Sequence, residues 1–338
     1  SLFRDPSHKQ ILIQEVHSLL SLGAVEEVPQ EQKRNGFYFR YFLILKAKGR
    51  LRPILDLWER NKFMGKLKFR MVSLASIIPS LDPGDWYVAL NLKDVYFHIA
   101  ITPSHRKYLR FVVSNKHYQF TVLPFGLSSV PHVFTKCMAV VAAFLCRRQV
   151  QVFSYLDDWL IKGCSRAKVE AQVDFIRTTF DELDLILNVR KSTLFPVQWI
   201  EVIGVVLGST QTRGYLLEAR FQALDNVIQS LRQFPITTAR NCLNLLGHMA
   251  SCTYEVQHAR LRLRPLQSWL ASVYWLARNS LERVLTLPRP VPDSLQWWFD
   301  PQVVCAGDPF TGEHIWETSG HKASGLRWNS LSTSMSES

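Results

Sequence analysis

Two adjacent carboxylates lie inside a stretch that otherwise has the apolar pattern of a β-hairpin. The segment reads Val152-Phe153-Ser154-Tyr155-Leu156-Asp157-Asp158-Trp159-Leu160-Ile161. Its pattern predicts a strand at Val150–Tyr155, a tight turn at Asp157-Asp158 and a return strand at Trp159–Lys162. Like charges side by side repel and resist desolvation, so buried strands seldom end in paired acids unless a cation such as Mg²⁺ binds them. A solvated Asp-Asp turn is the structural alternative.

Paired carboxylates that bind Mg²⁺ are typical of sites for phosphoryl transfer from a nucleoside triphosphate. That reaction uses two metal ions, and bridging them requires a further acid from a neighbouring strand. The candidate strand is Trp86–Leu92, in which Asn91 stands near the end and Asp94 follows. Asn91 offers only a neutral carbonyl. Asp94 lies three residues further on, where continuation of the strand would turn it to the other face.

The composition favours a polyanionic partner. The formal net charge is +12 and the pI about 9.5, and basic side chains that neutralise phosphates release counterions. The six cysteines show no paired spacing typical of zinc or disulfides. We find no apolar run of the ~20 residues that span a bilayer and no signal peptide at the start, which lacks Met. We therefore expect an intracellular, non-secreted piece of a longer reading frame with no membrane partner.

The rest of the chain mixes helices and strands. With 338 residues, it exceeds the ~250–300 residues of one core, so we expect a large domain and a smaller one. Apolar spacing predicts helices at 8–22, 130–148 and 165–187, with Gly23 ending the first, and a strand at Val202–Leu207. Tyr41–Leu45 and Leu51–Leu57 predict a β-hairpin with a cationic tip. Helical patterns follow at 217–234, 237–252 and 256–285, and we expect residues 311–338 to be poorly ordered.

Five motifs, in order, resemble those of retroelement reverse transcriptases. Asn91–Ile99 resembles motif A, usually D-L-K-D-A-Y-F-H-I, and Leu123–Phe134 resembles motif B. Tyr155–Asp158 matches the YxDD of motif C, Leu187–Ser192 resembles motif D, and Ile203–Leu207 resembles motif E. The phrases FGLSSxPxVFTK and VFxYLDDWL look most like the DIRS group of retrotransposons.

This resemblance implies an α+β right-hand polymerase with fingers, a palm built on an antiparallel sheet, and a thumb. The expected organisation is an N-terminal helix and lead-in at 1–36, fingers and palm at 37–210, a helical thumb at 211–290, and a connection remnant at 291–338 without an RNase H domain. The implied activity is RNA-directed DNA polymerisation on an RNA or DNA template–primer. Deoxynucleoside triphosphates would be the substrates, and Mg²⁺, or alternatively Mn²⁺, the cofactor.

The resemblance also assigns residues. Asp157, Asp158 and position 91 correspond to the catalytic carboxylates, and Asp157, Asp158 and Leu92 to the metal ligands. Tyr96 would pack against the incoming sugar, and Phe125 and Gly126 would lie under the nucleotide and template. Asp94, Lys46, Lys48, Arg52 and Lys191 would lie near the triphosphate or the leaving pyrophosphate. The structural alternatives are a core tyrosine, a plain turn and a solvated basic hairpin.

The chain departs from the family pattern at three positions. Asn91 replaces an aspartate, Trp58 stands where the family usually has Arg, and Arg60 stands where it has an aliphatic residue. Losing several kcal/mol of attraction to Mg²⁺ would lower the rate roughly a thousandfold or more. An alternative function is therefore a catalytically dead relic that folds and binds RNA or template–primer. A basic scaffolding protein with a chance Asp-Asp turn is a further alternative, which predicts no preference for a recessed 3′ end.

Overall fold

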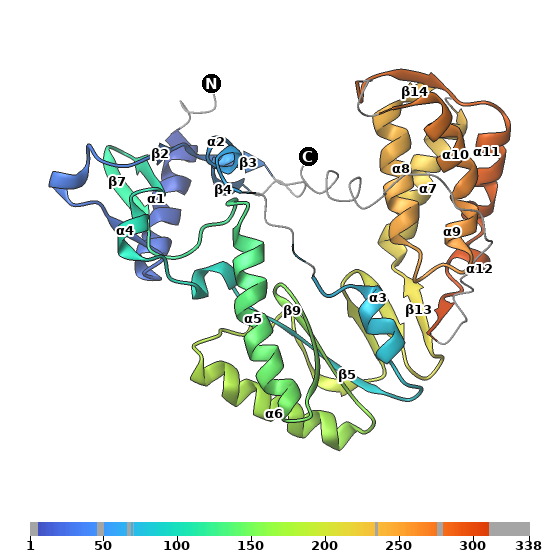
Figure 1. The fold of residues 1–338 in the computed structure, drawn as a ribbon, viewed down its shortest axis with the longest axis horizontal. Coiled ribbons are helices and arrows are strands. Elements are labelled where there is room, and N and C mark those ends of the chain that lie inside the picture. The colour runs from blue at the N-terminus through green and yellow to red at the C-terminus, as the bar shows by residue number, and fades with distance from the viewer. Residues whose placement is uncertain are drawn as a thin grey trace. The chain divides into compact units, whose positions relative to one another are not determined.

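The computed structural model describes residues 6–45, 51–65, 69, 71–233, 236–275 and 280–310. The chain divides into two compact units. The first comprises residues 1–72, 89–161 and 170–194, and the second comprises 73–88, 162–169 and 195–338. The chain passes between units within strands β5 (Trp86–Asn91) and β9 (Asp158–Gly163). Each unit is described below by itself (Figure 1).

A small sheet and a helix form the N-terminal part of the first unit. Helix α1 (Pro6–Ser21) is followed by Gly23, whose φ of +66° permits the chain reversal that ends the helix. The sheet has the order β1-β7-β6-β2. Its strands are β1 (Val25–Glu27), β2 (Tyr38–Phe39), β6 (Arg110–Val113) and β7 (Lys116–Phe120). Val16 and Leu19 of α1 share a buried core with Phe111 and other apolar side chains of the sheet.

A second hairpin and several short helices complete this part. Strands β3 (Tyr41–Leu45) and β4 (Leu51–Leu55) pair antiparallel, as the sequence predicts, while the basic tip lies outside the described residues. Helices α2 (Trp58–Lys62) and α4 (Pro103–Arg106) and the 3₁₀ turns η1 (Gln30–Gln32) and η3 (Val95–His98) connect the strands.

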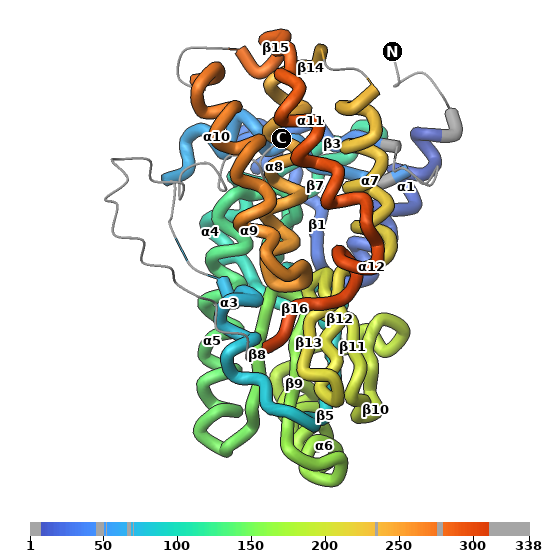
Figure 2. Tube along the Cα trace, turned by 90° about the vertical axis from the view of Figure 1, so that its right-hand side faces the viewer, coloured from blue at the N-terminus to red at the C-terminus, as the bar shows by residue number. Residues whose placement is uncertain are grey.

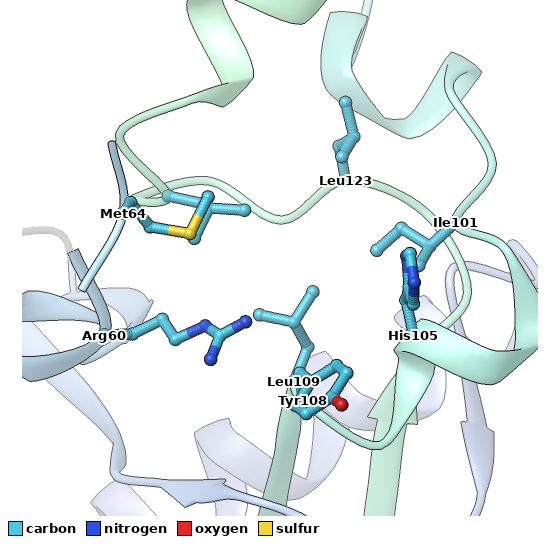
Figure 3. Close-up of a pocket in the computed structure, with 8 residues that line it drawn as sticks. Arg60, Met64, Ile101, His105, Tyr108, Leu109 and Leu123 are labelled. Carbon is cyan, nitrogen blue, oxygen red and sulfur yellow. The ribbon is translucent and has the colours of Figure 1, made fainter. Parts of the chain in front are cut away.

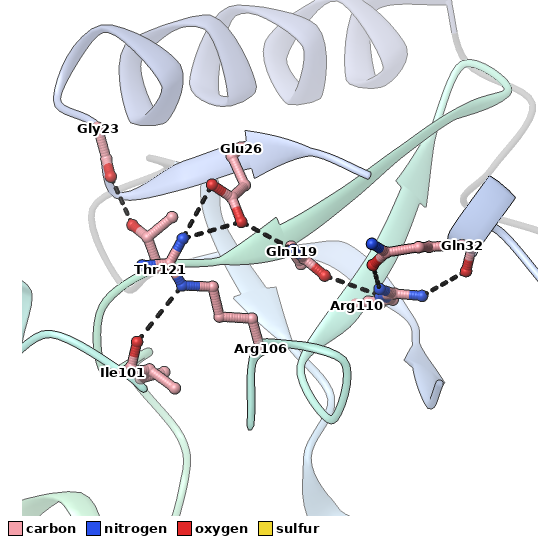
Figure 4. Close-up of polar contacts among 8 residues, drawn as sticks. All are labelled: Gly23, Glu26, Gln32, Ile101, Arg106, Arg110, Gln119 and Thr121. Atoms are coloured by element: carbon pink, nitrogen blue, oxygen red, sulfur yellow. Dashed lines mark hydrogen bonds and ion pairs between the residues drawn. The ribbon is translucent and has the colours of Figure 1, made fainter. Parts of the chain in front are cut away.

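Arg110 of strand β6 is buried, and within the described part of the chain its side chain donates to uncharged acceptors. Its side chain is 1% exposed. Its Nε donates to Gln119 Oε1 at 2.9 Å, and its two terminal nitrogens donate to Gln32 O and Oε1 and to Asn35 O. Gln119 in turn donates to Glu26 at 2.7 Å, as Figure 4 shows. The guanidinium therefore fixes the loop that leads into β2.

Replacing Arg110 by methionine is expected to lower the free energy of unfolding by about 3 kcal/mol, because several buried acceptors lose their donor. Thermal or urea unfolding measures the loss. The matched control is Arg106→Met, because Arg106 pairs with Glu26 at 3.0 Å while both side chains are partly exposed. That change is expected to cost less than about 1 kcal/mol. Equal losses in the two variants would contradict this account of Arg110.

The central sheet has the order β10-β5-β9-β8. Strand β8 (Gln151–Tyr155) leads through a turn into β9, and β10 (Thr193–Val197) is an edge strand. Helices α5 (Val130–Arg147) and α6 (Arg166–Glu182) confirm the two long helices predicted from the sequence, although α6 is shorter than expected. The fully buried Trp159 of β9 meets Phe180 of α6 edge to face at 5.1 Å.

Helix α5 is long and apolar enough to cross a membrane by length and composition. Lys136 interrupts the apolar residues of this helix, so its sequence contains no unbroken run of the ~20 apolar residues expected for a span. One face of α5 buries Val130, Phe134 and Leu145, and the helix contacts β8. Core helices of proteins that cross no membrane can be equally long and apolar, so this single helix is weak evidence for a span.

Helices dominate the second unit, as Figure 2 shows. The large ones are α7 (Glu218–Gln233), α8 (Ala239–Ser251) and α10 (Arg264–Val273), and shorter ones are α3 (Leu74–Ile77), α9 (Ala259–Arg262), α11 (Pro290–Ser294) and α12 (Pro301–Val304), with 3₁₀ turns η2 (Ile78–Ser80) and η4 (Leu295–Phe299). Leu224, Leu245 and Trp298 belong to the buried core between the larger helices. A sheet of order β11-β12-β13-β16 accompanies them, with strands Trp199–Val202, Val205–Gly208, Arg213–Leu216 and Asp308–Pro309.

Two element predictions in this unit are wrong. The helical pattern at 256–285 is split into α9 and α10 and ends in strand β15 (Val284–Thr286), which pairs with β14 (Ile236–Thr238). Pro265 stands at the start of α10, where its missing amide hydrogen ends one helix and suits the first turn of the next. The strand expected at Val202–Leu207 is a hairpin instead, because Ile203 and Gly204 both have positive φ and reverse the chain.

Candidate active site

Position 91 and the acidic pair come together from neighbouring strands of the first unit. Asn91 is the last residue of β5, Asp158 is the first of β9, and these strands are adjacent in the sheet. Asn91 Nδ2 donates to Asp158 Oδ1 at 2.7 Å and to Asp157 Oδ2 at 3.1 Å. The backbone adds a further link, because Leu92 N donates to Asp157 O at 2.8 Å. The three side chains therefore form one contiguous polar cluster.

The turn that presents the acids differs from the sequence prediction by one residue. The turn comprises Leu156 and Asp157, and Asp158 already belongs to β9. Leu156 has a φ of +50°, which is unfavourable for a residue with a Cβ. Such strain persists where the surrounding structure enforces it, and it often marks a functional site. Here the strained turn directs both carboxylates toward Asn91.

The Asp158 carboxyl lies in an environment that disfavours its charge. Burial raises the pKa of Asp158 above its ordinary value of 3.8, and the neighbouring charge of Asp157 raises it further. The hydrogen bond from Asn91 and the charge of Lys191 act in the opposite direction without cancelling the rise in pKa. A positive charge placed against these oxygens would therefore be stabilised.

Replacing Asp158 by asparagine is expected to raise the melting temperature at pH 7 by about 2 °C, because a desolvated charge is removed. A raised folded-state pKa means that ionised Asp158 costs stability above that pKa. The cost disappears below the ordinary value of 3.8, where the carboxyl is protonated in both states. The gain in melting temperature should therefore vanish in melting curves recorded below pH 3.8. A gain that persists unchanged there would exclude this origin.

The loop from Ile186 to Ser192 holds Asn91 from the other side. Asn188 N donates to Asn91 O at 2.7 Å, and Asn91 N donates to Ser192 Oγ at 2.9 Å. Ile186 N donates to His98 Nε2 at 3.1 Å, while the other ring nitrogen of His98 lies 3.1 Å from Val95 O. His98 is therefore a link between chain segments, and the exposed Lys191 is carried by the same loop. The sequence reasoning missed Ser192, although it lies within motif D.

An aromatic cluster adjoins the acids. Tyr96 lies 4.9 Å from Phe125 and 5.7 Å from Phe134, measured between ring centroids. Burial raises the pKa of the Tyr96 hydroxyl, and the charge of Asp157 contributes further. The charge of Asp157 thus acts on the Tyr96 hydroxyl. Two of the predicted nucleotide-binding residues, Tyr96 and Phe125, are thus in contact.

Gly126 is held by a residue that the sequence analysis did not select. Its φ is +97°, a conformation that a side chain would make unfavourable. Asn61 Nδ2 donates to Gly126 O at 2.9 Å, and Asn61 Oδ1 accepts from Ser128 N at 2.9 Å. The side-chain amide of Asn61, in α2, thus holds the turn that follows Pro124 in place. Only the sequence neighbourhood of Asn61, next to the unusual Arg60, could have drawn attention to it.

The remaining predicted residues have mixed outcomes. Asp94 lies outside the acidic cluster, but the reason we expected is wrong: β5 ends at Asn91, and Asp94 sits after it with a φ of +48°. Lys46 and Lys48 lie outside the described residues. Arg52 stands opposite Ile44 in the β3–β4 hairpin. Leu92 is 2% exposed, and its aliphatic side chain has no atom that binds a cation, so its backbone carbonyl is the group that could do so.

The donor set fits one divalent cation better than two. Asp157 and Asp158 supply hard, charged oxygens of the kind that Mg²⁺ prefers. Within the part of the chain that the structure describes, no group of three or more acidic, histidine or cysteine side chains could hold a metal. The Asn91 amide instead points its hydrogens at both carboxylates. The residues present therefore lack the third carboxylate that a pair of cations requires.

Comparisons with known proteins agree with the motifs. Residues 44–207 match the family model described as Reverse transcriptase (RNA-dependent DNA polymerase). The retrovirus-related Pol polyprotein from transposon 412 of Drosophila melanogaster is 28% identical over 148 residues, which are 44% of this chain and 12% of that protein. The enzymatic polyprotein of Cestrum yellow leaf curling virus is 26% identical over 224 residues, 66% of this chain and 33% of that protein. The chain thus spans a third or less of either relative.

Solved structures show the same fold. The foamy viral protease-reverse transcriptase dRH in complex with ds DNA aligns with a TM-score of 0.72 and 15% identity, covering 90% of this chain and 50% of that chain. The foamy viral protease-reverse transcriptase in complex with an RNA/DNA hybrid aligns with a TM-score of 0.63 and 15% identity, covering 87% and 37%. This likeness confirms the α+β right-hand polymerase fold that the sequence motifs predict.

Proposed function

We propose that this chain is the polymerase core of a retrotransposon reverse transcriptase, because residues 44–207 match the family model described as Reverse transcriptase (RNA-dependent DNA polymerase). It would add deoxynucleotides to the 3′ end of a primer paired with an RNA or DNA template. One observation carries the proposal: the side chains of Asp157, Asp158 and position 91 converge in one hydrogen-bonded cluster. The net charge of +12 suits a polyanionic partner.

Asp157 and Asp158 are the residues that would hold Mg²⁺ or Mn²⁺, with the Leu92 carbonyl beside them. A bound divalent cation supplies charge neutralisation at the reacting phosphate. The protein's own contribution is positioning. The strained Leu156 turn fixes the two carboxylates, and Ser192 and Asn188 fix the backbone of position 91.

The nucleotide would lie against Tyr96 and Phe125. Tyr96 offers a ring face to the sugar, and Gly126 allows close approach of the backbone because it lacks a Cβ. Lys191 and Asp94 would lie near the triphosphate, and the fingers hairpin would contribute Lys46, Lys48 and Arg52. Arg suits phosphate by its fork of donors, whereas Lys acts as a point charge.

A primer-extension assay on purified protein tests the proposal. The substrates are an RNA template with a recessed DNA primer and the four deoxynucleoside triphosphates, with Mg²⁺ and Mn²⁺ in separate reactions. Preferential binding of the recessed end over a blunt duplex, with extension that Asp157→Asn removes, supports the polymerase. Equal binding to any nucleic acid supports a basic scaffolding protein and rejects the proposal.

A second candidate function is a relic that binds template–primer without polymerising. The observation that favours it is the pair of bonds from Asn91 Nδ2 to both carboxylates, since these donors compete with a cation for the same oxygens. In that case the protein binds the recessed end but incorporates no nucleotide with either metal. The same assay therefore separates the two candidates.

The origin of the element and its location are also proposals. The phrases FGLSSxPxVFTK and VFxYLDDWL favour the DIRS group of retrotransposons. A phylogeny built from residues 44–207 of many elements tests that placement. We further propose an intracellular protein in the cytoplasm or nucleus, which localisation of a tagged chain would check.

A further inference from the structure

The first unit contains a cavity away from the acidic cluster. Its volume is about 270 Å³. Figure 3 shows Arg60 and Met64 entering from one side, with Ile101 and His105 opposite them. The other lining residues are Tyr108, Leu109, Leu123 and Leu127. The walls are thus mainly aliphatic, whereas Arg60, His105 and Tyr108 supply polar atoms.

An aromatic and cationic surface borders this cavity. The Arg60 guanidinium lies 5.0 Å from the centroid of the Tyr108 ring and 5.9 Å from that of Phe37. Lys107 Nζ lies 5.4 Å from the Tyr108 ring centroid. The Phe37 and Tyr108 rings are 5.6 Å apart, and Phe37 is 54% exposed. Two cations therefore flank one tyrosine beside an exposed phenylalanine.

The charge of Arg60 has no acidic partner within the described part of the chain. The adjacent acid, Glu59, pairs with Lys62 at 2.8 Å instead. The Arg60 guanidinium instead lies over two ring faces, which attract a cation without neutralising its charge. An anionic ligand would therefore find an uncompensated positive charge at the wall of the cavity. This complementarity points to a ligand with an apolar planar part and a negative group.

The surface is held in place before any ligand binds. Phe37 N donates to Lys107 O at 2.8 Å, and Arg110 N donates to Phe37 O at 3.1 Å. The buried Arg110 guanidinium fixes the loop leading to Phe37 through Gln32 and Asn35. Binding would consequently require little ordering of the chain, which favours affinity.

The cavity is also linked to the turn of the candidate active site. Its lining residues Leu123 and Leu127 lie on either side of Phe125 and Gly126 in the sequence. Asn61, next to Arg60, bonds to the carbonyl of Gly126. An occupant of the cavity would therefore contact the same short segments that hold this turn.

We propose that this cavity binds one unpaired base of single-stranded nucleic acid. The base would enter between the aliphatic walls and contact Tyr108, and Arg60 and Lys107 would bind the adjoining phosphates. Aromatic faces combined with cations are the usual means of holding single strands without reading sequence. The volume falls just below the roughly 300–1,000 Å³ of drug-sized ligand sites, as suits a single base.

The inference rests on the proposed function, because a polymerase on a template–primer handles an unpaired template strand. It goes beyond that function by placing one unpaired base in a particular cavity. A base from the template strand and a base from a free nucleotide share the same chemistry. The experiment must therefore include both sources.

The test uses the full chain and 2-aminopurine, a fluorescent base that stacking quenches. The probe is a primed duplex carrying 2-aminopurine at successive unpaired template positions. It is compared with a blunt duplex, with an unpaired oligonucleotide carrying 2-aminopurine, and with 2-aminopurine mononucleotide. The variants are Arg60→Leu, which removes the charge, and Leu123→Phe, which fills the cavity without changing charge. The control is Arg34→Leu, which removes an exposed arginine in the loop before Phe37. Melting curves verify that each variant folds.

The expected result is quenching at one unpaired position that Leu123→Phe abolishes. Arg60→Leu should weaken binding of the overhanging duplex about tenfold, Arg34→Leu less than twofold, and none should change binding of the blunt duplex. Absence of a quenched position, or unchanged binding in both test variants, would overturn the inference. Quenching by the mononucleotide alone would assign the cavity to free nucleotides and also reject it. Failure to bind any primed duplex would reject the proposed function, and quenching on an unpaired oligonucleotide would then still support the cavity.

Discussion

Replacing Asn91 by aspartate is expected to raise the rate of primer extension about a thousandfold, because it restores several kcal/mol of attraction between the site and Mg²⁺. In the present structure the Asn91 amide donates at 2.7 and 3.1 Å to the two carboxylates. An aspartate cannot donate these bonds. It would instead add a third negative charge, which only a cation can compensate.

A second readout does not depend on activity. Without divalent cations, the three carboxylates of Asn91→Asp should repel one another and lower the melting temperature. Added Mg²⁺ or Mn²⁺ should then raise the melting temperature of the variant far more than that of the wild type, because only the folded state binds the metal tightly. Asn91→Ser serves as the control, since it removes the amide without adding charge.

The outcome also decides between the two candidate functions. A variant that gains cation-dependent stability and extends the primer shows that Asn91 alone limits this copy. A variant that binds the recessed duplex and the metal but extends nothing shows that another part of the site is broken. No change in cation dependence would contradict the assignment of Asp157 and Asp158 as ligands.

Replacing Lys162 by methionine is expected to lower the free energy of unfolding by about 3–5 kcal/mol, the usual cost of leaving a buried charge without its partner. Lys162 is 2% exposed, and its Nζ lies 2.8 Å from both Asp82 Oδ2 and Asp85 Oδ2. Burial by itself lowers the pKa of this amine, but the hydrogen bonds and charges of both aspartates raise it overall. The ion pairs of Lys162 with Asp82 and Asp85 therefore stabilise the folded state at neutral pH.

Denaturant unfolding of the second unit measures the loss, and two further variants define its cause. Lys168→Met removes an exposed lysine of α6 and should change stability by less than about 0.5 kcal/mol. Adding Asp85→Asn to Lys162→Met should recover part of the loss, since the buried Asp85 then carries no charge, while Asp82 is 74% exposed. A double variant less stable than Lys162→Met would show that packing, and not the unpaired charge, causes the effect.

Features that depend on local pattern can be predicted from the amino-acid order alone. Alternating apolar residues around Asp157 and Asp158 predict a hairpin, and the structure contains it with the turn displaced by one residue. Spacing predicts α5, and Gly23 correctly marks the end of α1. The ordered motifs were sufficient to predict the right-hand polymerase fold, which the likeness to the foamy viral structures confirms.

Which polar side chains bond to each other across long stretches of sequence is visible only in the tertiary structure. The bonds of Asn91 to Asp157 and Asp158 cross 66 and 67 positions, and those of Lys162 to Asp85 cross 77. Periodicity shows which face of a helix or strand is apolar. It does not identify the distant residue to which a given polar side chain will bond. For the same reason no pattern revealed that Arg110 is buried or that Arg60 borders a cavity. Pairing of side chains is fixed only when packing brings whole elements together, because each hydrogen bond needs its partners within about 3 Å.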